Sequence, residues 1–204
     1  MIETIAFDFG RVIAHFDHGR TLGKLTAYTD MPQEEMFAHI YGGDLEDEFE
    51  SGRIGEQEFL RRFRTVCRLG CEAEFLAEAV ADIFWPNEPV CALIPQLKPR
   101  YRLVLASNTN PIHARKFVPQ LADTLRHFDA LVLSHEVGAR KPSREFFEHL
   151  VRVAGTPAER CLFIDDLPAN VAGAVACGLH GIAYTDADSL HSGLRQRGVV
   201  LDAG

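Results

Sequence analysis

The sequence predicts an α/β fold: a doubly wound, Rossmann-like parallel sheet interrupted by an inserted helical segment. Short apolar runs alternate with amphipathic helical stretches, which is the pattern of parallel strands covered by helices on both faces. Polar, reactive residues directly follow several of these runs, as expected at the carboxyl edge of such a sheet. Between the first and second runs, a long stretch has helical spacing only, and this marks the insertion.

Composition limits the classes of function. The 204 residues suit one domain, or one core domain with a small inserted module. Hydrophobic residues make up 47% and charged residues 25%, which supports a full core and argues against disorder. The net charge of −8 disfavours general binding to nucleic acid or an anionic membrane. Five cysteines without zinc-type pairs, and no apolar stretch of membrane-spanning length, predict a cytoplasmic protein, and a monomer is the default.

The predicted sheet has five strands. The first apolar run, residues 2–7, ends at Asp8. Four later runs predict strands at 103–106, 130–133, 162–164 and 181–184. Helices are expected at 90–97, 111–121, 143–154 and up to Cys177. Residues 156–159 have the order of a helix start, with a cap residue, a first-turn proline and a capping-box glutamate. The polar tail from Asp186 has no informative pattern.

The insertion is predicted to be wholly helical. Apolar residues recur on one helix face in 57–67 and again in 74–85, and no strand pattern interrupts the stretch. We therefore predict an α/β catalytic core formed by 1–14 and 90–204, and an α-helical cap formed by 15–89.

Side chains able to bind a metal ion or a phosphate follow the predicted strands. These are Asp8, Ser107, Asn108, Lys141, Asp165 and Asp166. Because parallel strands end at one edge of a sheet, we expect these groups to converge. Carboxylates gathered at one point repel each other unless a cation lies between them, and ligands that are all oxygen suit Mg²⁺. Lys141 adds positive charge for a phosphate, Ser107 offers a hydroxyl donor, and Asp8 remains as a nucleophile that forms an aspartyl-phosphate.

Four segments resemble, in order and spacing, the motifs of the haloacid dehalogenase superfamily. They are 5–13 around Asp8, 103–110 around Ser107, 138–147 around Lys141, and 161–170 around Asp165 and Asp166. The first motif has the form Asp-x-Gly and the next contains the string Ser-Asn-Thr-Asn. Both are most similar to the motifs of the branch containing bacterial α-glucose-1-phosphate phosphatases. The helical insertion lies where this family has its α-helical cap.

The resemblance implies a magnesium-dependent phosphatase that hydrolyses a small phosphorylated metabolite, such as a hexose-1-phosphate. It implies that Asp8 is the nucleophile, that Ser107 and Asn108 hold the phosphoryl group, and that Lys141 neutralises both. Arg11 either reaches the phosphate or is an exposed arginine.

The same resemblance implies the metal ligands. Asp8, the backbone carbonyl of Gly10 and Asp166 are the candidates for direct binding. Asp165 either shares the ion or orients a metal-bound water, and Asn170 orders the loop behind the acids.

The chain departs from the family pattern at Gly10. Most phosphatases of this family have a second aspartate there, which protonates the leaving group and then activates water. General acid–base help is worth ~10²–10⁴-fold. The alternatives are a slow enzyme, a preference for good leaving groups such as sugar-1-phosphates, or another acid–base group. Asp17 and His15 are near in sequence, but neither is favoured.

Two rival functions remain open. A metal-independent haloacid dehalogenase also uses a nucleophilic aspartate and lacks the second acid, but the paired Asp165 and Asp166 argue against it. A non-catalytic phospho-ligand-binding protein would explain Gly10, but it has no need of a nucleophile.

Two other features are given no functional assignment. The acidic run Glu46, Asp47, Glu48 and Glu50 is expected to be a solvated face. His113 follows the Ser-Asn-Thr-Asn string; it either points toward the site or, as we favour, lies at the surface or at a helix cap.

Overall fold

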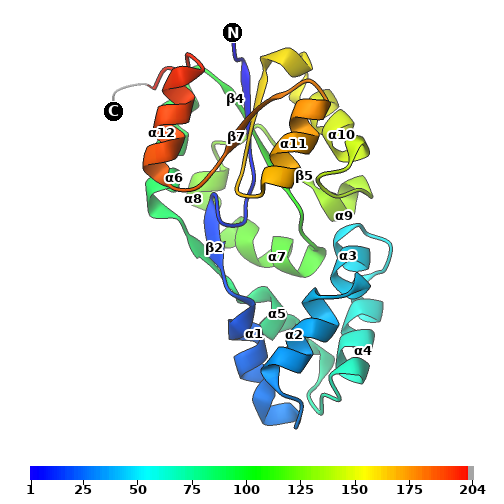
Figure 1. Cartoon of the computed structure of the whole chain (residues 1–204). Helices are drawn as coiled ribbons and strands as arrows, with labels where there is room; N and C mark the ends of the chain where they lie inside the picture. The colour runs from blue at the N-terminus through cyan, green and yellow to red at the C-terminus, as the bar shows by residue number, and fades with distance from the viewer. Residues whose placement is uncertain (202–204) are drawn as a thin grey trace.

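A computed structural model describes residues 1–201 and contains a five-stranded sheet in the order β5-β4-β1-β6-β7 (Figure 1). Its strands are β1 (Thr4–Phe7), β4 (Arg102–Ser107), β5 (Ala130–Leu133), β6 (Cys161–Asp165) and β7 (His180–Ala183). Every neighbouring pair in this sheet is parallel. β1 lies in the middle and is buried along its whole length, as its continuous apolar run predicts. The expected α/β fold class is therefore confirmed.

Helices cover both faces of the sheet. Successive side chains of a strand point to opposite faces, so a buried strand presents apolar residues to helices on both sides. Ile5 and Phe7 of β1 pack in one apolar cluster with α6 (Glu88–Leu97), α7 (Pro111–Gln120) and α12 (Ala187–Gln196). The intervening Ala6 packs in the other cluster, with α10 (Arg144–Ala154) and α11 (Pro168–Ala176). The short helices α8 (Ala122–Leu125) and α9 (Ser134–Val137) complete this lobe.

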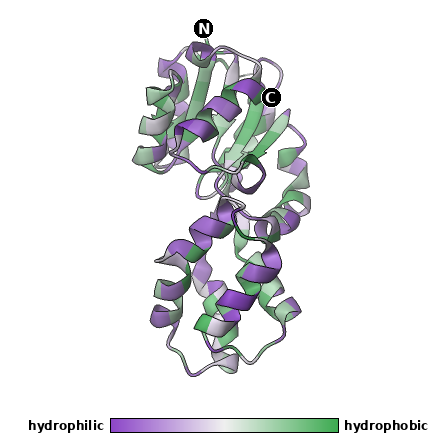
Figure 2. Ribbon diagram, turned by 90° about the vertical axis from the view of Figure 1, so that its right-hand side faces the viewer, coloured by the Kyte–Doolittle hydropathy of each residue, from purple (hydrophilic) through white to green (hydrophobic). Residues whose placement is uncertain are grey.

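The inserted segment forms a second, helical lobe. It consists of α1 (His18–Leu25), the 3₁₀ turn η1 (Thr26–Tyr28), α2 (Gln33–Tyr41), α3 (Asp44–Glu50), α4 (Glu56–Val66) and α5 (Ala73–Ala81). Their inward faces share a separate apolar core that includes Met36, Phe49 and Phe63. Figure 2 shows the polar faces of these helices on the outside of an elongated molecule.

The insertion contains a two-stranded ribbon that its sequence pattern did not predict. β2 (Ala14–Phe16) pairs antiparallel with β3 (Phe84–Pro86), so the chain enters and leaves the helical lobe at neighbouring points. The rings of His15 and Trp85 face each other across the ribbon, 5.9 Å apart. Three residues are too few for the alternation that identifies a strand, which explains the omission.

One further prediction about local structure was wrong, and one helix was not predicted. Residues 156–159 do not start an α-helix; they lead into the 3₁₀ turn η2 (Ala158–Arg160), and the Thr156 hydroxyl lies 2.8 Å from that of Thr4 instead of capping. The polar tail contains α12, which is capped by Asp186 and anchored by the buried Leu190 and Leu194. Two apolar residues on one face were too few to detect. Within residues 1–201, no helix combines the length and apolar character of a membrane span.

The substitution Asn87→Ala is expected to lower the free energy of unfolding by about 1–3 kcal/mol, because it leaves buried acceptors unpaired. The Asn87 side-chain amide is buried and donates to the Val12 carbonyl and to the Tyr184 hydroxyl, both at 2.8 Å. Urea unfolding monitored by circular dichroism measures the change. Gln57→Ala, which removes an exposed amide, is the control and should shift the midpoint little. An equal effect of both substitutions would contradict the prediction.

Candidate active site

The carboxyl edge of the sheet brings the predicted site residues together. Asp8 directly follows β1, Ser107 ends β4, and Asp165 ends β6. Lys141 comes from the loop after α9. A cavity of about 340 Å³ lies between this edge and the helical lobe. Its lining from the sheet side includes Asp8, Gly10, Arg11, Ser107, Asn108, Lys141, Asp166 and Asn170.

Lys141 is the buried cation of the site. Its Nζ donates to Asp8 Oδ1 at 2.6 Å and to Asp165 Oδ2 at 2.7 Å, and only 1% of the side chain is exposed. Burial alone would lower the pKa of Lys141, but the two carboxylates outweigh it and the pKa lies above its ordinary value. The ammonium therefore stays charged at neutral pH.

Asp8 is a buried carboxylate whose negative charge is only partly offset by Lys141. Burial raises its pKa to about 7, and the neighbouring Asp165 adds to the rise, while Lys141 opposes it. The backbone N–H of Phe9 donates to Asp8 Oδ1 at 2.7 Å. Because Lys141 also donates to Oδ1, Oδ2 is left without a donor among the described residues.

Asp165 and Asp166 differ in their surroundings. Asp165 is fully buried and accepts from Lys141, from the Leu167 N–H at 2.8 Å and from the Asn170 amide at 3.0 Å. Asp166 is half-buried and lines the cavity, and burial, followed by repulsion from Asp165, raises its pKa. Ligand oxygens of Asp8, Asp165 and Asp166 all lie within 4.8 Å of one another. These oxygen-only donors fit a hard divalent cation.

Ser107 and Asn108 lie at the site but differ in what their side chains contact. The Asn108 side-chain amide binds the backbone of Lys141. Its Oδ1 accepts from the Lys141 N–H at 2.8 Å, and its Nδ2 donates to the Lys141 carbonyl at 3.0 Å. The Ser107 hydroxyl makes only a 3.3 Å contact with the Asn108 carbonyl, so it remains available to a ligand. Asn108 thus positions the lysine.

The residues near Gly10 do not supply the missing acid. Asp17 caps α1 by accepting from the Gly19 N–H at 2.7 Å, and His15 is exposed beside Trp85. Neither lines the cavity of Asp8. Arg11, with φ 59°, is largely exposed at the rim, and its Nε lies 3.9 Å from Asp166 Oδ2.

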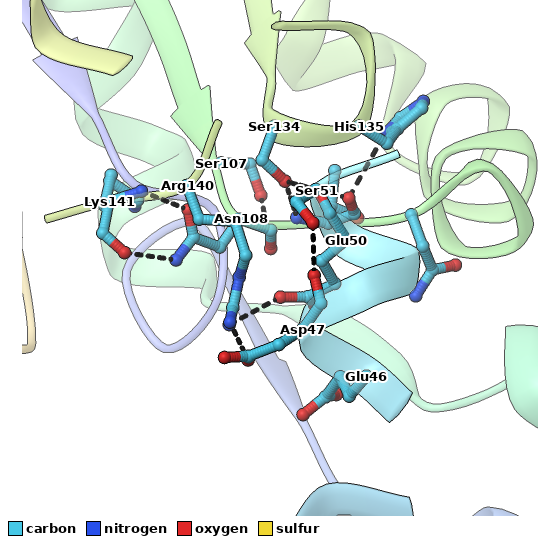
Figure 3. A network of polar contacts seen from close by, with 12 residues as sticks. Glu46, Asp47, Glu50, Ser51, Ser107, Asn108, Ser134, His135, Arg140 and Lys141 are labelled. Carbon is cyan, nitrogen blue, oxygen red and sulfur yellow. Dashed lines mark hydrogen bonds and ion pairs between the residues drawn. The ribbon is translucent and has the colours of Figure 1, made fainter. Parts of the chain in front are cut away.

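The acidic run is only partly a solvated face, because Asp47 is exposed whereas Glu46 and Glu50 are turned inward. Glu46 and Glu50 of α3 line the cavity, and Glu50 is 7% exposed. Arg140 of the core pairs with Glu50 at 2.8 Å and also with Asp47 (Figure 3). The spacing of Leu45 and Phe49 fixes which face of α3 packs on the helical lobe. That Glu46 and Glu50 are four residues apart indicates a shared face, but nothing local indicates that this face meets the sheet.

For His113 the less favoured alternative, a position toward the site, is correct. It is buried and lines the cavity, and its pKa is lowered to about 3 by burial and then by His18, which keeps the ring neutral. The residue that caps α7 is Asn110, whose Oδ1 accepts from the His113 N–H at 3.0 Å. Its ring packs nearly perpendicular to that of Phe84, with 5.1 Å between the ring centroids, and Phe84 belongs to the unpredicted β3.

The stability of Glu46→Gln is expected to depend on pH differently from that of the original protein. Burial raises the pKa of Glu46 to about 7 from 4.5, although Arg140 opposes the rise. Between these pH values the folded protein holds a proton that the unfolded chain releases, so stability falls as pH rises through this window. Glu46→Gln lacks this pH-dependent loss. Its free energy of unfolding, relative to that of the original protein, should therefore rise between pH 5 and pH 8.

Urea unfolding at both pH values tests this expectation. Glu34→Gln, on an exposed position of α2, is the matched control. A Glu46→Gln difference that is constant with pH would contradict it.

Known proteins share the sequence pattern and the fold of this chain. The family model of haloacid dehalogenase-like hydrolases matches residues 2–178. The chain is 25% identical to the D-ribitol-5-phosphate phosphatase of Bacteroides thetaiotaomicron, over 84% of this chain and 86% of that protein. The structure of a haloacid dehalogenase-like hydrolase from Porphyromonas gingivalis superposes with a TM-score of 0.81 at 28% identity, covering 97% and 98% of the two chains. A haloacid dehalogenase family enzyme of Bacteroides thetaiotaomicron, solved as a magnesium complex, superposes with a TM-score of 0.75 at 25% identity, covering 90% and 93%. The chain belongs to the haloacid dehalogenase-like hydrolase family.

Proposed function

We propose that this hydrolase is a magnesium-dependent phosphatase that cleaves a small phosphomonoester through an aspartyl-phosphate on Asp8. One observation supports this most directly: Asp8, Asp165 and Asp166 gather their oxygens within 4.8 Å, beside the buried ammonium of Lys141. A dehalogenase reaction has no use for the third carboxylate, and a pure binding protein has no use for a nucleophile.

The acidic cluster supports Mg²⁺ as the cofactor. Lys141 contacts Asp8 and Asp165, so Asp166 keeps a charge that this lysine does not pair directly. Asp8, Asp166 and the Gly10 carbonyl would hold the ion, while Asp165, already bonded to Lys141 and Asn170, orients the cluster. When bound, Mg²⁺ neutralises charge on the phosphoryl oxygens and on the carboxylates. A related family enzyme was solved as a magnesium complex.

The residues then divide the reaction between them. An Asp8 carboxylate oxygen attacks phosphorus, and the bond from phosphorus to the leaving oxygen breaks with its electron pair on that oxygen. The Ser107 hydroxyl donates to a phosphoryl oxygen, and Lys141 offsets the charge of the nucleophile. The leaving oxygen takes a proton from solvent, because Gly10 supplies none. Water then attacks phosphorus, and the bond from phosphorus to the Asp8 oxygen breaks, which releases inorganic phosphate and restores the Asp8 carboxylate. Arg11, at the rim, is available to a phosphoryl oxygen in the closed site.

The substrate we propose is a small sugar or polyol phosphate. Gly10 supplies no proton to the leaving group, which favours esters with good leaving groups, such as a hexose-1-phosphate. The likeness of the first two motifs to the α-glucose-1-phosphate phosphatase branch supports the same class, and one relative is named for D-ribitol-5-phosphate. In this proposal residues 15–89 are the cap that closes over the core formed by 1–14 and 90–204.

Asp8→Asn is expected to abolish phosphate release, because an amide oxygen is a poor nucleophile. In the original protein, release from p-nitrophenyl phosphate and a panel of sugar phosphates should require Mg²⁺ and stop with excess chelator. A malachite green assay for inorganic phosphate measures both. Full activity in Asp8→Asn would refute the mechanism. Halide release from a chloro-acid in the presence of chelator would favour the dehalogenase, and metal binding without any turnover would favour the binding protein.

Gly10→Asp is expected to maintain or raise turnover, with the largest gain on substrates that have poor leaving groups. A Cβ at this position would lie 3.0 Å from Phe16 Cε1, so the ring must shift by a few tenths of an ångström. The gain from acid–base help is at most about 10²–10⁴-fold. Initial rates on an alkyl phosphate, which has a poor leaving group, and on p-nitrophenyl phosphate, which has a good one, show whether the gain depends on the leaving group. Gly10→Asn has the same size without the acid and should give no such gain; equal gains in both variants would contradict a proton-transfer explanation.

A further inference from the structure

Four aromatic rings in mutual contact line one part of the active-site cavity. Phe16 of β2 and Phe84 of β3 pair across the ribbon, with 6.1 Å between their ring centroids. The His18 ring packs against Phe16 at 5.2 Å, and the His113 ring packs against Phe84 at 5.1 Å. All four residues line the cavity, and we call them the ring wall.

The ring wall is uncharged at neutral pH. Burial lowers the pKa of His18 to about 4 and that of His113 to about 3, so neither imidazole is protonated. Phe16 is only half-buried, which leaves part of its ring open to a ligand, and Phe84 is 7% exposed. Ile83 extends the same lining. A ligand in the cavity therefore meets an apolar, largely aromatic surface here.

The ring wall begins close to the nucleophile. Gly10 is two residues from Asp8, and a Cβ at Gly10 would lie 3.0 Å from Phe16 Cε1. An in-line attack by Asp8 places the leaving oxygen on the far side of phosphorus, within the same cavity. The group attached to that oxygen therefore extends along the cavity lining to which Phe16 belongs.

The cavity also has a polar lining, which comes from α3 and the loop before Lys141. Glu46, Glu50 and Arg140 line it, and Arg140 pairs with Glu50 at 2.8 Å. Burial raises the pKa of Glu46 to about 7 and that of Glu50 well above its ordinary value, so their carboxyl groups can donate as well as accept hydrogen bonds. A hydrocarbon leaving group would bury these groups without partners, whereas hydroxyl groups would pair with them.

The two linings together match a sugar ring better than an open chain. A pyranose presents several C–H groups on one face and hydroxyl groups around its edge, so its C–H face can lie on Phe16 while its hydroxyls reach α3. An open-chain polyol must first lose the rotational freedom of several bonds to present the same surface, and this loss weakens its binding.

We propose that Phe16 and Phe84 are specificity-determining residues, which hold the C–H face of a cyclic sugar in the leaving-group position and so favour ring-shaped sugar phosphates over open-chain polyol phosphates. The inference rests on the proposed phosphatase function and decides between the two kinds of substrate that this function leaves open.

Glucose 6-phosphate and sorbitol 6-phosphate test the ring wall, because both release phosphate from a primary alcohol and they differ in ring against chain. In the original protein, kcat/KM for glucose 6-phosphate is expected to exceed that for sorbitol 6-phosphate by about tenfold. In Phe16→Leu this ratio is expected to fall by about threefold to tenfold, mainly through KM, because leucine offers no flat face. Phe84→Leu should act in the same direction, and Phe16→Tyr, which keeps the ring, should retain the ratio.

Phe75→Leu is the matched control. Phe75 of α5 is also half-buried and packs on the ring of Tyr28, but it does not line the cavity, so the ratio should not change. Release of phosphate from p-nitrophenyl phosphate without the preference for glucose 6-phosphate would overturn the ring wall alone. An unchanged ratio in Phe16→Leu would overturn it too, as would faster hydrolysis of farnesyl phosphate than of glucose 6-phosphate. If the original protein released phosphate from none of these esters, the phosphatase itself would be refuted.

Discussion

The site depends on one interaction, the pairing of the Lys141 ammonium with both Asp8 and Asp165. Two buried carboxylates so close together would otherwise repel each other and take up protons. The Asn108 side chain holds the lysine backbone through two hydrogen bonds, so its position is set from β4. One cation thereby ties the ends of β1, β4 and β6 together, and the remaining acidic character is what makes the cluster suitable for a second, divalent cation.

The loop that carries Lys141 also holds the helical lobe. Arg140 pairs with Glu50, and the Ser134 hydroxyl donates to the Glu50 carbonyl at 2.6 Å. Gly52, at φ 68°, lies so close to the His135 backbone that a Cβ would come within 2.5 Å of the carbonyl oxygen. Helix α9 and the loop that follows it therefore fix both the charge at Asp8 and the position of α3 over it.

Sequence predicted the sheet side of the site and missed the helical side, for a physical reason. Asp8, Ser107 and Asp165 each follow a buried run, and the parallel strand order alone brings them together. Glu46 and His18 reach the cavity only because one lobe packs against the other, and that packing depends on contacts distant in sequence, such as Arg140 with Glu50. β2 and β3 were too short to show a period, and each forms only with its partner.

The β2–β3 ribbon has an evolutionary consequence. Because Ala14 pairs with Pro86, the segment between them is joined to the sheet lobe at adjacent points, like a long hairpin loop. Insertions with neighbouring ends are tolerated because they leave the connectivity of the host domain unchanged. Selection can therefore lengthen, reshape or exchange the helical lobe while the order of the five parallel strands is inherited intact. The lobe that bears on substrate range and the lobe that carries the phosphoryl chemistry can therefore evolve separately within one polypeptide.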